Sequence, residues 1–266
     1  MKWALYLKLF IQNISKMFFG NNLKDVNHCF FSRLGGNSIN IYNSLNCGSG
    51  SKDKKKDIKI NRLIVSNYFS LKSNQLCTLH QTHSNRVTIL DKFNPNKIYI
   101  YDGIVTKQKN IILGILTADC APILFYDSKK RIAGACHAGW KGAFTGIISN
   151  TIDAMISIGS SKKDISCSIG PCIGSNSYEV MNDFYNNIIA ANTHDRIYFN
   201  RIKSDRYLFD LKSFIVDRLK SKGIVDISSI NLDTYSNDML FYSYRRSVHK
   251  KEDDYGRMIS TIVIKD

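Results

Sequence analysis

The chain has 266 residues, enough to bury a sizeable core without requiring a second domain. Its 44% hydrophobic and 22% charged residues are typical of a globular protein, and no apolar run approaches the roughly 18 residues of a membrane-spanning helix. The net charge of +15 is scattered over lysine-rich loops, which argues against nucleic acid as the partner. Seven cysteines, an odd number, do not suit a disulfide framework and predict a reducing, cytoplasmic location.

The first 24 residues are predicted to be an N-terminal extension, and residues 25–266 to form one domain. The apolar stretch at the start is interrupted by Lys8 and other polar residues, and no small-residue cleavage site follows, so a secretory signal is not expected. Apolar residues from Trp3 to Phe18 recur on one helical face. Two interpretations stay open: an amphipathic helix, or a non-native segment upstream of a translation start at Met17.

Short runs of β-branched and aromatic residues predict strands, which in chain order are residues 28–31, 75–80, 86–90, 111–116, 123–126, 131–137, 165–169 and 260–264. Helical patterns predict helices over residues 142–158, 177–191 and 210–222. The segment GSGSKDKKKD, residues 48–57, is predicted to be a loop from its composition. With no internal repeat and no shift in composition, the pattern indicates one domain of the α/β or α+β class.

Two histidines and one cysteine stand where predicted strands end in turns. His83 lies in LHQTHSNRV, Cys120 in LTADCAP and His137 in GACHAGWKG. Two imidazoles and a thiolate form a three-ligand set for zinc that leaves a fourth position open, as in catalytic sites. The spacing matches no zinc finger, so the residues alone also allow a buried thiol and two strand-capping histidines. His80 is the weaker candidate, because residues three apart on a strand face opposite sides.

Eight segments in order resemble the laccase-domain family, also called polyphenol-oxidase-like proteins or peptidoglycan editing factors. These segments are FSRLGGNSINIYNSLNCG, NRL, LHQTHSNRV, YDGIVT, GILTADCAPILFYD, GACHAGWKGAFTGI, IGPCIGSNSYEV and FYSYRR, and they span roughly residues 30–264. The resemblance implies a layered α/β sandwich with mixed sheets. It also implies that His83, Cys120 and His137 bind Zn²⁺, with Cu²⁺ as the alternative ion.

The family's activity leads us to expect phosphorolysis of adenosine, guanosine, inosine and S-methyl-5′-thioadenosine to the base and (methylthio)ribose 1-phosphate. Deamination of adenosine to inosine is expected at the same site. Asp119 is expected to orient a ligand or move a proton beside the three metal ligands. The expected substrate- and phosphate-binding residues are Arg33, Asn46, Lys141 and Arg245, and the amides of GPCIG are a further candidate for holding an anion.

This sequence departs from the family pattern at two places. Lys141 stands where arginine is usual, and Asp233 stands where cysteine is common. The expected partners are purine nucleosides and phosphate, with no nucleic acid and no membrane, and the protein is expected to be a monomer or a small homo-oligomer.

Three other functions stay open at this level. One is a copper-dependent polyphenol oxidase, although six histidines are few for a multicopper centre. Another is a hydrolase of peptidoglycan editing with Cys120 as the nucleophile and His137 as its base. The third is a basic protein that binds nucleotides or RNA without turnover.

Overall fold

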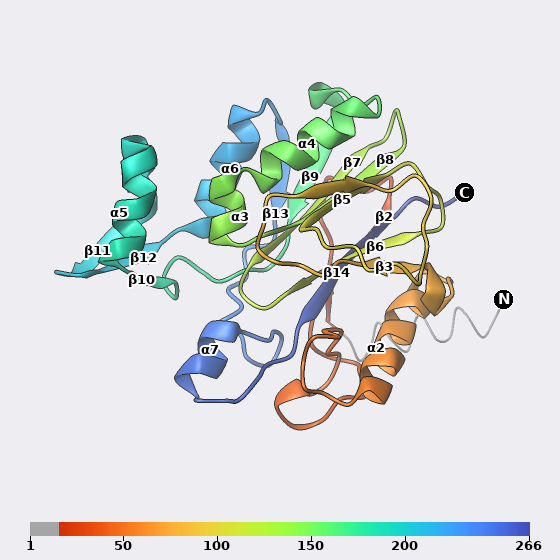
Figure 1. Ribbon diagram of the computed structural model, residues 1–266, viewed down its shortest axis with the longest axis horizontal. Coiled ribbons are helices and arrows are strands. Elements are labelled where there is room, and N and C mark those ends of the chain that lie inside the picture. The colour runs from red at the N-terminus through yellow and green to blue at the C-terminus, as the bar shows by residue number, and fades with distance from the viewer. Residues whose placement is uncertain (1–15) are drawn as a thin grey trace.

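The computed structural model describes residues 16–266 (Figure 1). The first six strands are β1 (Met17–Phe18), β2 (Asn27–Phe31), β3 (Leu76–Thr78), β4 (Val87–Ile89), β5 (Gly103–Thr106) and β6 (Ile112–Thr117). The next five are β7 (Ala121–Asp127), β8 (Ile132–Ala138), β9 (Ile165–Ile169), β10 (Glu179–Met181) and β11 (Phe199–Lys203). The last three are β12 (Arg206–Phe209), β13 (Asp226–Ser229) and β14 (Met258–Val263). The α-helices are α2 (Lys55–Tyr68), α3 (Trp140–Thr145), α4 (Ile147–Ser157), α5 (Asn182–Ala191), α6 (Leu211–Ser221) and α7 (Tyr244–His249).

The described strands form three sheets. A five-stranded sheet has the order β1-β2-β14-β6-β3, and a six-stranded sheet has the order β13-β9-β7-β8-β5-β4. Each contains both parallel pairs, such as β3 with β6 and β4 with β5, and antiparallel pairs. A third sheet, β10-β12-β11, lies with α5 in a lobe beside the main body (Figure 1).

Apolar side chains stack the two large sheets and the helices into layers. Along β8, Ile132 and Cys136 belong to the core that includes side chains of α4 and α6, whereas Ala133 and Ala135 face the core shared with the five-stranded sheet. This alternation is what a strand buried on both faces requires. A third apolar cluster joins the five-stranded sheet to α2. The structure therefore confirms the predicted fold class, which is a layered α/β sandwich with mixed sheets.

Several element boundaries were predicted incorrectly. The helix predicted over residues 142–158 is two helices, because Gly146 between them adopts a left-handed backbone with φ 104°. The second predicted helix begins only at Asn182, since residues 179–181 pair with β12 instead. Phe18 pairs with β2 and is not helical, and the rest of the predicted N-terminal helix lies outside the described residues.

The lysine-rich segment predicted as a loop contains the start of α2. That helix forms because Ile58, Val65 and Tyr68 recur on one face and are buried, so tertiary packing stabilises it despite the repelling lysines at its start.

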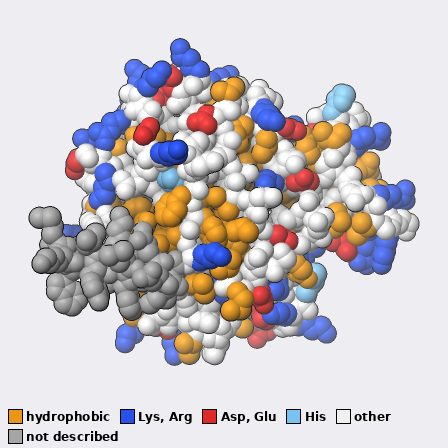
Figure 2. All heavy atoms as spheres, turned by 180° about the vertical axis from the view of Figure 1, so that it is seen from behind, with side chains coloured by type: hydrophobic (Ala, Val, Ile, Leu, Met, Phe, Trp, Pro, Cys, Tyr) orange, Lys and Arg blue, Asp and Glu red, His pale blue; other side chains and the backbone are white. Residues whose placement is uncertain are grey.

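On the face shown in Figure 2, lysines and arginines are spread around the outline while hydrophobic side chains gather near the middle. Within residues 16–266, no helix has the length and apolarity needed to cross a bilayer.

Candidate metal and anion site

His83, Cys120 and His137 come together at one point. One ligand atom from each lies within 4.8 Å of the others, and the Sγ of Cys120 is 3.8 Å from the Nε2 of His83. The two imidazole rings are nearly perpendicular, with centroids 4.7 Å apart. His137 is on β8, while the other two lie in the turns after β3 and β6. His83 adopts a left-handed backbone with φ 58°, a conformation that is uncommon outside glycine and recurs at functional positions.

Because Gly139 has no side chain, the three ligand residues can lie close together. A Cβ atom at this position would lie 2.8 Å from the Sγ of Cys120 and 3.1 Å from the Cδ2 of His83. No ordinary side chain fits at those distances, so the glycine of HAGW keeps the ligand atoms close together. The two imidazoles and the thiolate are the donor set that zinc favours, and copper also accepts it.

Asp102, buried at the start of β5, orients two of the three side chains. Its Oδ1 lies 2.9 Å from the Nδ1 of His137 and accepts a hydrogen bond of 3.0 Å from the backbone amide of His83. Its Oδ2 accepts bonds from the amide and hydroxyl of Ser84. The Nε2 of His137 is thereby left to face the cluster, which is the carboxylate–histidine–metal arrangement.

The proton affinities within the cluster reflect these contacts. Burial raises the pKa of Asp102, but the hydrogen bonds from His137 and Ser84 outweigh burial and hold it well below its usual range. Burial lowers the pKa of His137, whereas Cys120 and Asp102 raise it to about 9. For the Cys120 thiol, burial raises the pKa, but His137 and His83 bring it down to about 7. The cluster thus favours a thiolate, the form that binds metals.

Asp119 adjoins Cys120 but points away from it. Its carboxylate accepts hydrogen bonds from the Oγ1 of Thr234 at 2.7 Å, the Oγ of Ser243 at 2.9 Å and the amide of Arg245 at 2.7 Å. Its backbone is left-handed, with φ 87°. Burial raises its pKa. Asp119 therefore ties the turn that carries Cys120 to the start of α7.

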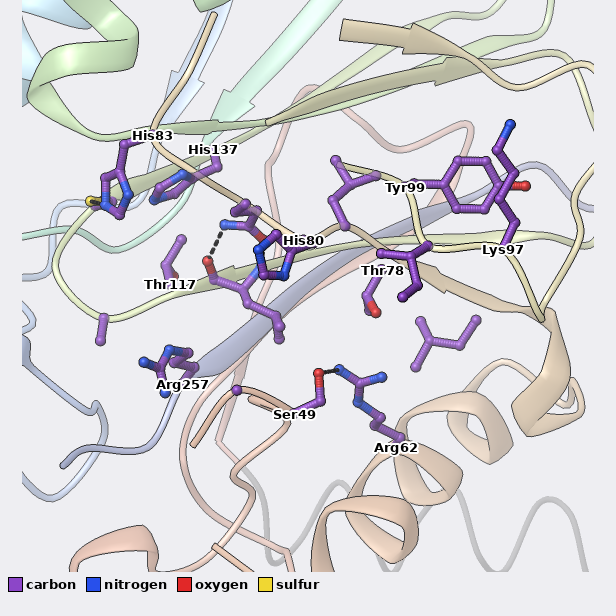
Figure 3. A pocket seen from close by; sticks show the side chains of 18 of the residues that line it. Ser49, Arg62, Thr78, His80, His83, Lys97, Tyr99, Thr117, His137 and Arg257 are labelled. Carbon is purple, nitrogen blue, oxygen red and sulfur yellow. Dashed lines mark hydrogen bonds between the residues drawn. The ribbon is translucent and has the colours of Figure 1, made fainter. Parts of the chain in front are cut away.

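The cluster forms one end of a cavity of about 560 Å³ (Figure 3). Its lining residues include Arg62, Arg257 and Lys97, and among the described residues no aspartate or glutamate lines it. None of these three cations forms an ion pair within residues 16–266. Figure 3 places Arg257 on the side of the cluster and Arg62 beside Ser49. His80 also lines the cavity but is not part of the metal cluster.

Arg62 and Arg257 enclose one short loop, residues 47–50. The Nε of Arg62 donates to the carbonyl of Cys47 at 2.9 Å, and its Nη2 to the Oγ of Ser49 at 3.3 Å. The stem of Arg257 packs against Gly48, where a Cβ would come within 2.8 Å of the arginine Cδ. Burial lowers the pKa of Arg62. The Nη1 of Arg257 donates to the carbonyl of Tyr255 at 3.1 Å. Two guanidinium groups without a carboxylate partner and a serine hydroxyl are well suited to binding an anion.

The four residues predicted to bind substrate or phosphate do not line this cavity. Arg33 lines a neighbouring cavity of about 310 Å³ and donates to the carbonyl of Asp238 at 3.0 Å. The Nη1 of Arg245 donates to the carbonyl of Glu179 at 2.7 Å. Lys141 is exposed on α3 and forms no ion pair with a described residue.

Asn46 does not line the cavity but supports the residues that do. It is fully buried, and its Oδ1 accepts hydrogen bonds from the amides of Gly48 at 3.0 Å and Arg257 at 2.9 Å. It therefore fixes the loop and the backbone of Arg257 relative to each other.

The turn GPCIG was a candidate for binding an anion. In the structure the group bound at this turn is a carboxylate of the chain itself, that of Asp233. The Oδ1 of Asp233 accepts a hydrogen bond of 2.9 Å from the amide of Gly174, and its Oδ2 accepts one of 2.5 Å from Ser177. The carboxylate at the position where the family often has cysteine thus occupies this turn, and its pKa is lowered because these bonds outweigh its burial.

Sequence reasoning missed Asp102, Arg62 and Arg257 as site residues. A signal existed for two of them, since Asp102 lies in YDGIVT and Arg62 in NRL, both segments of the family resemblance. The position of Arg257 depends on β14 lying between β2 and β6, which no local pattern reveals.

A family model described as multi-copper polyphenol oxidoreductase laccase matches residues 27–265. The chain is 37% identical over 202 residues to a purine nucleoside phosphorylase of Rickettsia prowazekii. The aligned region covers 76% of this chain and 82% of that protein. It is 32% identical over 256 residues to the purine nucleoside phosphorylase YlmD of Bacillus subtilis, with 92% and 91% covered.

Solved structures share the fold. The hypothetical protein YfiH of Bacillus licheniformis superposes with a TM-score of 0.83 at 31% identity, over 90% of this chain and 93% of that one. YlmD of Geobacillus stearothermophilus gives a TM-score of 0.85 at 21% identity, over 95% and 99%. With its predicted ligand set gathered in space and the family model matching almost the whole described chain, the protein belongs to the laccase-domain family that its sequence segments resemble.

Proposed function

We propose that the protein is a zinc-dependent purine nucleoside phosphorylase that also deaminates adenosine to inosine. Its substrates in this proposal are adenosine, guanosine, inosine and S-methyl-5′-thioadenosine, together with phosphate. The observation that carries the proposal is one cavity that holds both the His83–Cys120–His137 cluster and two arginines without carboxylate partners. The names of the curated relatives support the same activity.

The cluster residues would hold the metal ion. Zinc is our choice, with copper as the alternative, because two imidazoles and one thiolate leave a position free for water or substrate. A zinc ion bound there would act as a Lewis acid and favour the deprotonation of water, which is the chemistry that attack on C6 of adenine needs. Asp102 fixes the orientation of His137, and Gly139 keeps the thiolate near His83.

Phosphorolysis breaks the bond between C1′ of the ribose and N9 of the purine and forms a bond from C1′ to a phosphate oxygen. The leaving nitrogen gains a proton. Holding phosphate against C1′ is mainly positioning and charge neutralisation. Arg62 and Arg257 are the residues we assign to this task, because both line the cavity and neither is paired with an acid among the described residues.

The roles predicted for Arg33, Lys141 and Arg245 remain as an alternative phosphate assignment. For Asp119 we propose a positioning role through its bonds to α7 instead of proton transfer. We further propose a cytoplasmic enzyme, supported by seven cysteines that form no disulfide, acting as a monomer or a small homo-oligomer.

The test is a product assay with zinc-loaded protein and adenosine, with and without phosphate. The variants are His83→Ala and Cys120→Ala, and His194→Ala serves as the matched control because its side chain is exposed in the α5 lobe. We expect phosphate-dependent adenine and phosphate-independent inosine from the wild type and the control, and neither product from the two cluster variants.

Other outcomes would point elsewhere. Oxidation of a phenol by the copper-loaded protein, without any product from nucleosides, would favour the polyphenol oxidase. An active protein that contains no metal and is inactivated by alkylation of Cys120 would favour the hydrolase. Salt-dependent RNA binding without turnover would favour the binding protein.

A further inference from the structure

Thr117, the last residue of β6, has a buried hydroxyl group without a partner. Only 2% of the residue is exposed, and its Oγ1 makes no hydrogen bond within the described part of the chain. Leaving a buried hydroxyl unpaired is costly, so such a group calls for an explanation. Thr117 also lines the cavity that contains the metal cluster.

The other buried threonines of the described chain are all satisfied. The hydroxyl of Thr106 donates to the carbonyl of Leu90 at 2.6 Å, and that of Thr151 to Ile147 at 2.8 Å. Thr234 donates to Asp119 and Thr261 donates to the carbonyl of Cys29. Two buried serine hydroxyls, those of Ser160 and Ser168, also lack a partner within the described residues, but neither residue lines the cavity. Thr117 is thus the unpaired buried hydroxyl that a ligand in the cavity could reach.

The position of Thr117 suggests the chemistry of its missing partner. Figure 3 shows Thr117 between His137 of the cluster and Arg257. A ligand atom that lies between a metal-binding cluster and a guanidinium group is expected to be an anionic oxygen, which accepts hydrogen bonds and donates none. The Oγ1 of Thr117 is itself buried in the structure. Rotation about the Cα–Cβ bond of threonine exchanges its methyl group and its hydroxyl between staggered positions, and such a rotation would bring the hydroxyl to the cavity.

We propose that the hydroxyl of Thr117 donates a hydrogen bond to the phosphate co-substrate, on the side of that phosphate nearest the metal cluster. This rests on the proposed function for the identity of the anion. No described residue pairs with the hydroxyl, and a bound phosphate would supply its partner. Thr117 is then a phosphate-binding residue whose polar group contributes to ligand binding and not to folding.

The proposal separates stability from binding. Thr117→Val replaces the hydroxyl by a methyl group of similar shape, so it removes an unpaired polar group and leaves the unfolding midpoint unchanged or higher. Thr106→Val is the matched control, because the same change there removes a satisfied hydroxyl and leaves the carbonyl of Leu90 without that donor. That control variant is expected to have a lower unfolding midpoint and, while folded, to bind phosphate like the wild type.

The experiment is a calorimetric titration of full-length, zinc-loaded protein with inorganic phosphate, for the wild type, Thr117→Val, Thr117→Ser and Thr106→Val. We expect Thr117→Val to raise the dissociation constant about tenfold, the loss expected for one hydrogen bond to a charged group. Thr117→Ser keeps the hydroxyl and should stay within about twofold of the wild type.

Two results would overturn the proposal. One is a Thr117→Val protein that binds phosphate as tightly as the wild type. The other is weakened binding together with a fall in the unfolding midpoint as large as that of Thr106→Val, which would show a structural role. The titration contains no nucleoside. If it gives the expected result while no nucleoside is converted by the wild type, the proposed function fails and the phosphate site stands.

Discussion

The Nδ1 of His137 lies 2.9 Å from the Oδ1 of Asp102, and both groups are almost completely buried. The same carboxyl oxygen accepts a hydrogen bond from the backbone amide of His83. One carboxylate therefore sets the orientation of one metal ligand and the backbone position of a second. A substitution of Asp102 therefore disturbs the geometry of the site without changing a ligand.

We predict that Asp102→Asn lowers the zinc affinity by about 10- to 100-fold, the range found for groups that orient metal ligands. The amide cannot serve as acceptor for all the donors that now converge on the carboxylate. Competition with a coloured chelator measures the affinity. Asp195→Asn is the control, because it removes an equally buried carboxylate that pairs with Arg218 in another part of the fold. Equal zinc affinities in the two variants would contradict the role of Asp102.

We expect Gly139→Ala to weaken metal binding and to abolish turnover. The added Cβ would lie 2.8 Å from the Sγ of Cys120 and must push the thiolate away from the histidines. The backbone of Gly139 has φ −71°, which alanine adopts freely, so the effect is steric and local. Gly50→Ala, where a Cβ meets nothing within 4 Å, should retain the zinc affinity of the wild type. A Gly139→Ala protein with full zinc content would show that the cluster tolerates a wider spacing.

Arg62→Gln is predicted to raise the KM for phosphate about tenfold or more, because it removes from the cavity wall a guanidinium that has no carboxylate partner. Arg62→Lys should recover part of the loss, since it restores the charge without the planar fork. Lys141→Ala lies outside the cavity and should leave this KM within about twofold. If Lys141→Ala raised the KM for phosphate more than Arg62→Gln did, the phosphate-binding residues predicted from the sequence would be favoured.

The buried His28 predicts a loss of stability in mild acid. Its Nε2 accepts a hydrogen bond of 2.8 Å from the amide of Gly20, which a protonated imidazole cannot do. Burial lowers the pKa of His28 below its ordinary value of 6.5. Because the unfolded chain binds the proton more readily, the contribution to stability is fully present above about pH 6.5 and is lost as the pH falls through the folded-state pKa.

Urea unfolding at about pH 7.5 and about pH 5.5 measures this loss. The wild type should lose up to about 1 kcal/mol more than His28→Gln over that interval, since one proton changes the free energy of unfolding by about 1.4 kcal/mol per pH unit at most. An identical pH dependence in both proteins would mean that His28 has the same pKa in the folded and unfolded states.

Much of the fold and the core of the site could be predicted from the sequence. Strand β9 matches its predicted range of residues 165–169, because its apolar residues alternate with serines, which is a local signal of a strand. The cluster of His83, Cys120 and His137 was predictable because each residue lies within its own family segment, at the end of a strand.

What could not be predicted depends on contacts between distant segments. Asp119 and Asp102 are both aspartates at turns, and the sequence favoured the one next to Cys120. The register between β5 and β8, in which Gly103 pairs with Cys136, brings Asp102 to His137 instead. The unsatisfied hydroxyl of Thr117 is equally invisible in a sequence, because its burial and its lack of a partner are properties of the packed cavity.

The place of β14 in the five-stranded sheet has a consequence for how the protein is made. β14 is the last described strand in chain order, yet it lies between β2 and β6 in the middle of the sheet. A nascent chain interrupted before Arg257 has no strand to join those two, and it also lacks this arginine of the cavity wall. Nearly the whole domain must therefore be synthesised before the five-stranded sheet can form. Truncated translation products should stay incompletely folded, so proteases can degrade them and they have no enzyme activity.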